Sequence, residues 1–168
     1  MVATTDICDA NSTLLTTGEL KVLYPLFKPY GKRQTFNGQV IAVRVFEDNV
    51  IVRTLLESTE HQGKVLVVDG GGSMRCALMG GNLGQIAQTN GWVGIVVNGC
   101  VRDVDEINEC DIGVWALGTS PVKSKKVGVG EKNVSVYFGG CLIHHGDWLW
   151  ADHDGILVSK HQLSCTSS

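Results

Sequence analysis

The sequence predicts an α/β fold in which parallel strands occupy the middle of the chain and antiparallel strands lie toward its end. Three short, continuous apolar runs have the pattern of strands that are buried on both faces, and turn-rich or helical segments separate them: residues 66–69, 95–99 and 114–118. The later apolar runs are instead joined by Gly-Gly and Asp-Gly turns, which are typical of antiparallel hairpins. Together these two patterns indicate mixed sheets with parallel central strands.

The elements before this centre follow from periodicity. Residues 5–17 predict a short capped helix, and residues 20–29 predict an apolar link that two prolines interrupt. Residues 38–46 alternate polar and apolar side chains, as a strand with one buried face does. Residues 49–57 carry apolar side chains at helical spacing, so we expect a helix there.

The later elements are a helix at residues 83–89 and three strands. The strands are predicted at residues 134–138, 147–152 and 156–159. Asp154 and Gly155 tolerate a positive φ, so they predict a hairpin turn between the last two strands. We expect one domain over residues 1–160, followed by a flexible tail at residues 161–168.

Composition excludes several classes of protein. The chain has 168 residues, of which 43% are hydrophobic and 18% charged, and its net charge is −3, as is ordinary for a soluble globular protein. The only basic cluster, Lys123, Lys125 and Lys126, lacks interleaved aromatic residues, so we interpret it as a solvated loop and expect no direct contact with nucleic acid. The six cysteines form no CxxC pair, and no export signal or membrane span is visible. These features predict a cytoplasmic protein with reduced thiols.

A glycine pair marks the first candidate site. Gly80 and Gly81, with Asn82 and Leu83, stand at the start of the predicted helix, where free N–H groups and the positive helix end can bind a carboxylate. Neither this pair nor the glycine run at residues 70–72 matches a phosphate-loop or dinucleotide pattern. A nucleotide site is therefore not favoured.

The second candidate site follows the strand at residues 95–99. Arg102 can bind a carboxylate or an enolate with two donors, and the neighbouring Asp103 offers hard oxygen ligands to Mg²⁺ or Mn²⁺. The same residues also fit a helix cap, in which Asp103 precedes the helix and Glu106 follows three residues later. Both interpretations can hold at once, because one carboxylate has two oxygens.

The combined motifs resemble those of the RraA-like family, which includes the regulator of ribonuclease E activity A and the class II 4-hydroxy-4-methyl-2-oxoglutarate aldolases. The resemblance runs from about residue 5 to residue 159. It includes the signature Gly81-x20-Arg102-Asp103-x2-Glu106, the segment FEDN at residues 46–49 and the segment GDWLWADHDGI at residues 146–156. The implied fold is a swivelling β/β/α domain, and the implied assembly is a ring-shaped homotrimer with sites between subunits.

The resemblance also implies a role for each candidate residue. Arg102 would contact substrate oxygens, Asp103 would bind the divalent metal, and Glu106 would orient a metal-bound water. The pyruvyl carboxylate would bind the backbone of Gly80, Gly81, Asn82 and Leu83. Gly84 stands where many relatives have alanine or a bulkier residue, so the chain departs from the family's pattern at this position.

The implied function is a metal-dependent aldolase, with Mg²⁺ or Mn²⁺ as cofactor, that cleaves 4-hydroxy-4-methyl-2-oxoglutarate to two pyruvates. Oxaloacetate decarboxylation would be a side activity, since it passes through the same pyruvate enolate. The alternative is a non-catalytic regulator that binds and inhibits a ribonuclease E-type enzyme. That bacterial regulator lacks the metal-binding aspartate that stands here as Asp103, so the complete signature favours the enzyme.

A Schiff-base aldolase is the other chemical route to such a cleavage. It needs a lysine beside the reacting carbonyl group. Lys64 precedes its strand, and the remaining cluster of lysines is loop-like, so no lysine stands at the end of a central strand near the motif. We therefore favour the metal-dependent route.

Overall fold

The computed structural model describes residues 1–164 and has four parallel strands at its centre. These strands lie side by side in the order β3 (Phe36–Val45), β4 (Val65–Asp69), β6 (Gly94–Val101) and β7 (Gly113–Thr119). The predicted α/β class and the three predicted central strands are confirmed. Their continuous apolar sequences reflect burial on both faces, because all five residues of β4 are buried.

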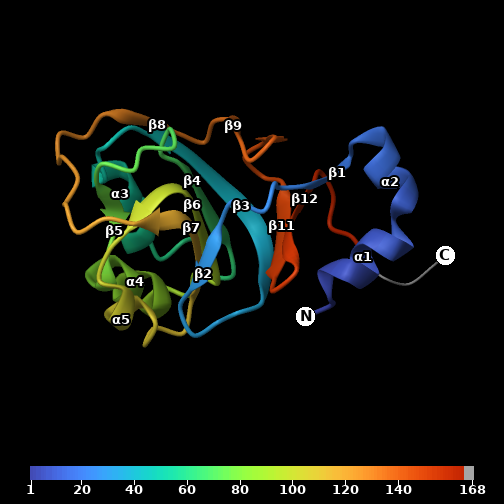
Figure 1. Cartoon of the computed structure of the whole chain (residues 1–168), viewed down its shortest axis with the longest axis horizontal. Helices are drawn as coiled ribbons and strands as arrows, with labels where there is room; N and C mark the ends of the chain where they lie inside the picture. The colour runs from blue at the N-terminus through green and yellow to red at the C-terminus, as the bar shows by residue number, and fades with distance from the viewer. Residues whose placement is uncertain (165–168) are drawn as a thin grey trace.

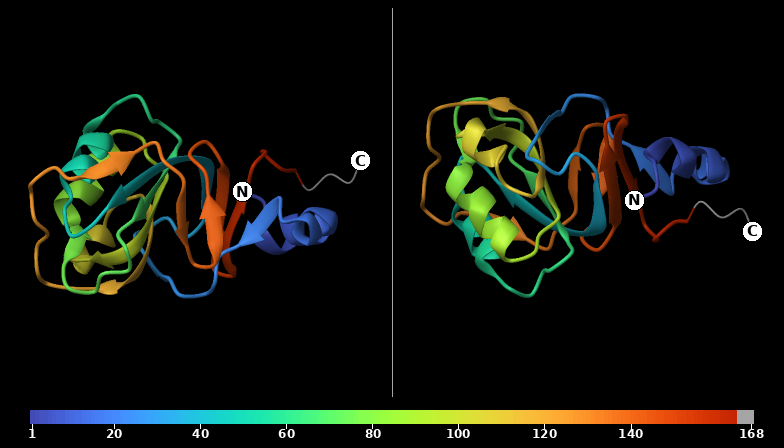
Figure 2. Two further views of the ribbon diagram at one scale, coloured as in Figure 1. Left: turned by 90° about the horizontal axis from the view of Figure 1, so that it is seen from above. Right: turned by 90° about the horizontal axis from the view of Figure 1, so that it is seen from below.

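Helices cover one face of this sheet and antiparallel strands cover the other (Figures 1 and 2). The helices are α3 (Val50–Glu57), α4 (Gly81–Thr89) and α5 (Val104–Ile107). The strands on the opposite side are β9 (Val136–Phe138), β10 (Cys141–Ile143), β11 (Trp148–Asp152) and β12 (Gly155–Ser159). Beyond β11 and β12 lie α1 (Thr4–Ala10) and α2 (Ser12–Thr17). Because β11 pairs with β3, one curled sheet contributes strands to both central layers, and helices lie on either side of them.

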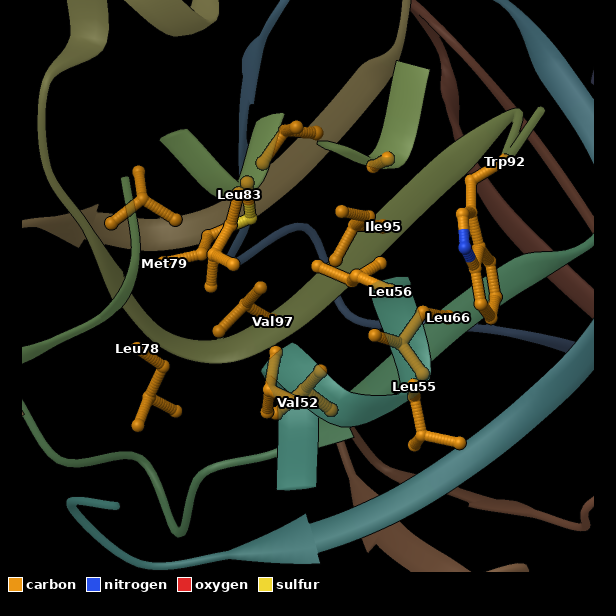
Figure 3. Packing of buried hydrophobic residues seen from close by; sticks show 14 of the residues in the cluster. Val52, Leu55, Leu56, Leu66, Leu78, Met79, Leu83, Trp92, Ile95 and Val97 are labelled. Atoms are coloured by element: carbon orange, nitrogen blue, oxygen red, sulfur yellow. The ribbon is translucent and has the colours of Figure 1, made fainter. Parts of the chain in front are cut away.

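Side chains point alternately to the two faces of each strand, and this alternation explains how three separate cores form between these layers. In β3, Ile41 and Val43 point toward the helices, whereas Val40 and Ala42 point toward the antiparallel strands. Figure 3 shows the helix-side core, in which side chains from α3 and α4 pack on β4 and β6. Trp150 of β11 faces the third core, which it forms with Ile7 of α1, Leu157 of β12 and Leu20.

Four short strands complete the sheets. β1 (Leu20–Val22) pairs with β12, β2 (Lys28–Tyr30) with β7, and β8 (Gly130–Lys132) with β3, all antiparallel. β5 (Ala77–Met79) runs parallel to β6. The prediction of a plain link at residues 20–29 was therefore wrong, because this segment contains β1 and the first part of β2, whose three-residue lengths are too short to show a period.

The hairpin between β11 and β12 is confirmed, since Asp152 pairs with Gly155 across it. The single capped helix at residues 5–17 was wrong in two respects. The chain breaks at Asn11 into α1 and α2, and the residue before α1 is Ala3, which has no capping side chain. Asp152 supplies the cap from the hairpin, because its carboxylate accepts hydrogen bonds from Thr4 N (2.8 Å) and Thr4 Oγ1 (2.7 Å).

Two expectations about the chain as a whole are only partly covered by the structure. No helix within residues 1–164 is long and apolar enough to cross a membrane. Leu163 packs against the third core, while residues 165–168 of the predicted tail lie outside the described residues. The flexible tail and the single domain over residues 1–160 both stay predictions.

Candidate active site

Two neighbouring parallel strands bring the halves of the signature together. β5 ends at Met79 and β6 ends at Val101, and these two residues are paired. The N–H of Arg102 donates to the carbonyl of Met79 over 2.9 Å, which continues the ladder past the ends of both strands. Gly80 and Arg102 therefore leave the sheet at the same edge, where α/β proteins commonly bind ligands.

The first half of the site is the start of α4. Gly80 occupies the N-cap position, and the N–H groups of Asn82 and Leu83 lie in the first turn, where a helix supplies no acceptor. The Leu83 side chain points into the helix-side core with Met79 (Figure 3), so only its backbone is available to a ligand. The structure therefore has a helix start at the predicted turn, while its binding of a carboxylate stays a prediction.

Asp103 has an unusual backbone conformation, with φ of 54° in the left-handed region. Such a conformation costs a non-glycine residue about 1–3 kcal/mol, although Asp tolerates it better than most residues. Its side chain makes no capping hydrogen bond to α5 within the described chain; Oδ2 instead accepts the N–H of Gly81 over 3.3 Å. The helix begins after Asp103 as the capping interpretation required, but the carboxylate is directed to the candidate site.

Both glycines are needed because acidic side chains pack directly against them. A Cβ at Gly80 would lie 2.6 Å from Asp103 Oδ2, and a Cβ at Gly81 would overlap the Glu106 carboxylate. Glu106 therefore stands next to Asp103 at the start of α4, while remaining exposed to solvent. The structure thus brings all seven predicted site residues to one place.

A pocket of about 120 Å³ opens beside these groups. The predicted residues Gly80, Asn82, Leu83, Arg102 and Asp103 line one part of it. Sequence reasoning missed the residues that line the rest, which are the polar residues Asn49, Arg53, Lys123, Ser124 and Lys126 and the apolar residues Ala77 and Met79.

The missed lysines belong to the cluster that we interpreted as a solvated loop. Lys123 and Lys126 line the pocket, whereas Lys125 does not. The Nζ of Lys126 donates to Asn49 Oδ1 over 3.2 Å, and Asn49 Nδ2 donates to the carbonyl of Leu78 over 3.1 Å. The FEDN segment, which includes Asn49, was the signal in the sequence that could have linked this loop to the site.

The donor set around Asp103 fits a hard divalent cation but not zinc. Within residues 1–164 no three His, Cys, Asp or Glu side chains cluster as a ready-made metal site. Mg²⁺ is commonly held by one or two protein carboxylates together with waters and substrate oxygens, so the Asp103 carboxylate is a sufficient protein ligand. Arg102 lines the same pocket.

Comparison with known proteins assigns the family. The family model RraA-like, described as Aldolase/RraA, matches residues 4–158. The chain belongs to the RraA-like family. This assignment confirms the resemblance and the predicted fold class.

Curated relatives of this RraA-like chain carry an aldolase name. It is 64% identical over 162 residues, 96% of this chain and 97% of the other, to "Putative 4-hydroxy-4-methyl-2-oxoglutarate aldolase 3" of Arabidopsis thaliana. It is 53% identical over 160 residues, 95% of this chain and 96% of the other, to a Cupriavidus necator protein of the same name without a number.

Solved structures of the same fold carry other names. A Thermus protein described as the RNA-processing inhibitor RraA has a TM-score of 0.90 and 44% identity, over 98% of this chain and 96% of that one. A Geobacillus kaustophilus protein described as an S-adenosylmethionine:2-dimethylmenaquinone methyltransferase has a TM-score of 0.90 and 45% identity, over 96% of this chain and 97% of that one. Since one fold carries three names, the function must be argued from the site.

Proposed function

We propose that this RraA-like protein is a class II aldolase that cleaves 4-hydroxy-4-methyl-2-oxoglutarate into two pyruvates, with Mg²⁺ or Mn²⁺ as cofactor. The observation that carries the proposal is the position of the Asp103 carboxylate beside Arg102 and the start of α4. The backbone of Asp103 has a left-handed conformation at this position. Stored backbone strain of this kind is concentrated at functional sites. Relatives that are up to 64% identical carry an aldolase name, which supports the same function.

The chain's own groups suit the pyruvyl end of such a substrate. The N–H groups of Asn82 and Leu83, at the positive end of α4, would bind the C1 carboxylate. Arg102 would donate to the 2-oxo oxygen and stabilise the negative charge that develops there. A divalent ion on Asp103 would add positive charge and draw electrons from the same carbonyl group.

Cleavage breaks the C3–C4 bond. The C4 hydroxyl loses its proton and becomes the carbonyl of the first pyruvate, while the bonding electrons move to the other fragment as a pyruvate enolate. Protonation of that enolate at C3 yields the second pyruvate. Oxaloacetate would lose CO₂ through the same enolate, so we propose decarboxylation as a side activity.

Glu106 would orient a water beside Asp103, since its carboxylate lies against Gly81. We also propose a homotrimer in which a neighbouring subunit completes the site and supplies a base for the C4 hydroxyl proton. A location in the cytoplasm stays a prediction.

Pyruvate release by the purified protein tests the proposal. We expect turnover with Mg²⁺ that stops when a chelator is added, and a loss of about 100-fold or more in Asp103→Asn, as removal of one strong electrostatic group at a reacting centre produces. Asn tolerates a positive φ and keeps an oxygen for the Gly81 N–H, so a thermal melt should show a folded variant. A folded, metal-supplied wild-type protein without turnover would contradict the proposal.

A ribonuclease inhibitor is the second candidate, favoured by the 44% identity to the Thermus protein. It would act through its surface and would need no metal. The Asp103→Asn variant separates the two functions, because it should lose aldolase turnover yet retain any inhibition of a ribonuclease E-type enzyme. The cleavage of a ribonuclease E substrate, measured with and without added variant, gives this second readout.

A further inference from the structure

The pocket has more positive charge than the pyruvyl end of a substrate uses. Its lining carries the cations Arg53, Arg102, Lys123 and Lys126, against the single carboxylate of Asp103. Arg102 and the start of α4 serve the C1 carboxylate and the 2-oxo group in the proposed function. That assignment leaves no substrate group to bind Arg53, Lys123 or Lys126.

We infer that Arg53, Lys123, Ser124 and Lys126 form a subsite for a second carboxylate, which makes the pocket selective for dicarboxylic oxoacids over pyruvate-like monocarboxylic ones. This inference rests on the proposed function and assigns residues to the far end of the substrate. In 4-hydroxy-4-methyl-2-oxoglutarate that group is the C5 carboxylate, which leaves with the first pyruvate. We call these four residues the distal subsite.

Ser124 is the observation that points to a ligand. Its side chain is buried, with 5% of the residue exposed, and it lines the pocket between two lysines. Its Oγ has no hydrogen-bond partner among residues 1–164. A buried hydroxyl without a partner is unfavourable and rare in native structures, so a ligand oxygen that reached Ser124 would supply the acceptor that its Oγ lacks.

The loop that carries the distal subsite is firmly held. Asp48 accepts hydrogen bonds from the N–H groups of Val127 (2.9 Å), Gly128 (2.8 Å) and Val129 (3.3 Å). The N–H of Lys125 donates to the carbonyl of Glu47 over 2.8 Å. These bonds clamp residues 125–129 onto the FEDN segment at residues 46–49, which leads directly into α3 and Arg53.

Lys126 is held by its side chain, while the backbone of its neighbours is held by the FEDN segment. Its contact with Asn49 positions the ammonium group next to the end of β5, close to the turn that binds the C1 carboxylate. Arg53 donates from Nε to Glu57 over 2.7 Å, which leaves its terminal N–H groups for the pocket. A pre-positioned set of donors loses less conformational entropy on binding than a mobile one.

Binding of 2-oxoglutarate and of pyruvate tests the subsite without requiring turnover. 2-Oxoglutarate has both carboxylates but lacks the C4 hydroxyl needed for cleavage, and pyruvate lacks the second carboxylate. Isothermal titration with Mg²⁺ would measure both dissociation constants for the wild type, Lys126→Met and Ser124→Ala. Lys125→Met is the matched control, because it removes the same charge from the same segment outside the pocket.

We expect the wild type to bind 2-oxoglutarate more tightly than pyruvate. Lys126→Met should reduce this preference by about tenfold or more, as loss of a charged hydrogen-bond donor does. Ser124→Ala should reduce it with no loss of thermal stability, since it removes an unpartnered buried hydroxyl. Lys125→Met should leave the preference unchanged.

The outcomes separate this inference from the proposed function. A wild type without preference, or a preference kept in Lys126→Met and Ser124→Ala, would overturn the distal subsite even if the aldolase turns over. Equal losses in Lys125→Met would show a general charge effect and would also overturn it. A preference lost only in the two pocket variants supports the subsite, even if no pyruvate is released from 4-hydroxy-4-methyl-2-oxoglutarate.

Discussion

At the scale of single residues, Asp48 joins two segments that lie far apart in the sequence: the FEDN segment and the loop that carries Lys126. Asp48 is 3% exposed. Its carboxylate accepts hydrogen bonds from the N–H groups of Val50, Val127, Gly128 and Val129. Burial by itself would raise the pKa of Asp48, but the four hydrogen bonds together outweigh it and lower that pKa below its ordinary value. Asp48 is therefore charged at neutral pH and stabilises the loop that carries Lys126.

Asp48→Asn should destabilise the protein by about 1–3 kcal/mol at pH 7, because four N–H groups lose their charged acceptor. A lowered pKa in the folded state means that Asp48 adds stability above its unfolded pKa of about 3.9, and that this stability is lost as the pH falls through the folded value. The difference between wild type and Asp48→Asn should therefore shrink below about pH 4. Urea unfolding at pH 7 and near pH 3 measures it.

Asp9→Asn is the control for this pH series, since Asp9 is an exposed aspartate on α1. Its free energy of unfolding should stay close to that of the wild type at both pH values. Equal destabilisation of Asp48→Asn at pH 7 and pH 3 would mean that the charge of Asp48 does not stabilise the loop.

At the scale of elements, α4 shows how two acidic side chains determine the start of a helix. Gly80 and Gly81 leave room for Asp103 and Glu106, which pack against the first turn. Gly84 lies one turn further along, where a Cβ would be 3.4 Å from Cys110 Sγ, an ordinary packing distance. Glycine is thus required for close approach at the first turn but not at residue 84.

Alanine substitutions at two glycines of α4 should therefore have different effects on activity and stability. Gly81→Ala should lower the proposed aldolase activity by about tenfold or more, because displacing Glu106 disturbs a site that tolerates little misplacement. Gly84→Ala should keep the activity and raise stability by about 0.5–1 kcal/mol, since alanine is favoured over glycine within a helix. Thermal melts and pyruvate release measure both variants. Loss of activity in Gly84→Ala together with retention in Gly81→Ala would contradict this account.

At the scale of the whole molecule, three exposed apolar side chains lie on the FEDN segment and the loop clamped to it. Phe46 is 58% exposed, Val127 73% and Val129 67%, and all three belong to the FEDN segment or the loop clamped to it. Large exposed apolar side chains that lie together commonly mark a contact between proteins. A second copy packed here would complete the site, as the proposed homotrimer requires.

Val127→Asp should therefore weaken the trimer and reduce activity together, because a carboxylate would be buried at the contact without a partner. Sedimentation velocity gives the mass of the wild type and the variant. Val2→Asp provides the control: this residue is 44% exposed and precedes α1, which lies on the far side of the molecule from α3 (Figure 1). A monomeric wild type, or a Val127→Asp variant that stays trimeric, would contradict this assembly.

The sequence by itself determined the α/β class, the central strands, the β11–β12 hairpin and the residues of the signature. These features are local. Short stretches of sequence determine that β4 is buried on both faces and that Arg102 and Asp103 follow β6. Only the tertiary structure decided that Asp152 caps α1, that Asp103 contacts Gly81, and that Lys123 and Lys126 line the pocket with Arg53. Such contacts join residues far apart in the chain, so no periodicity or spacing encodes them.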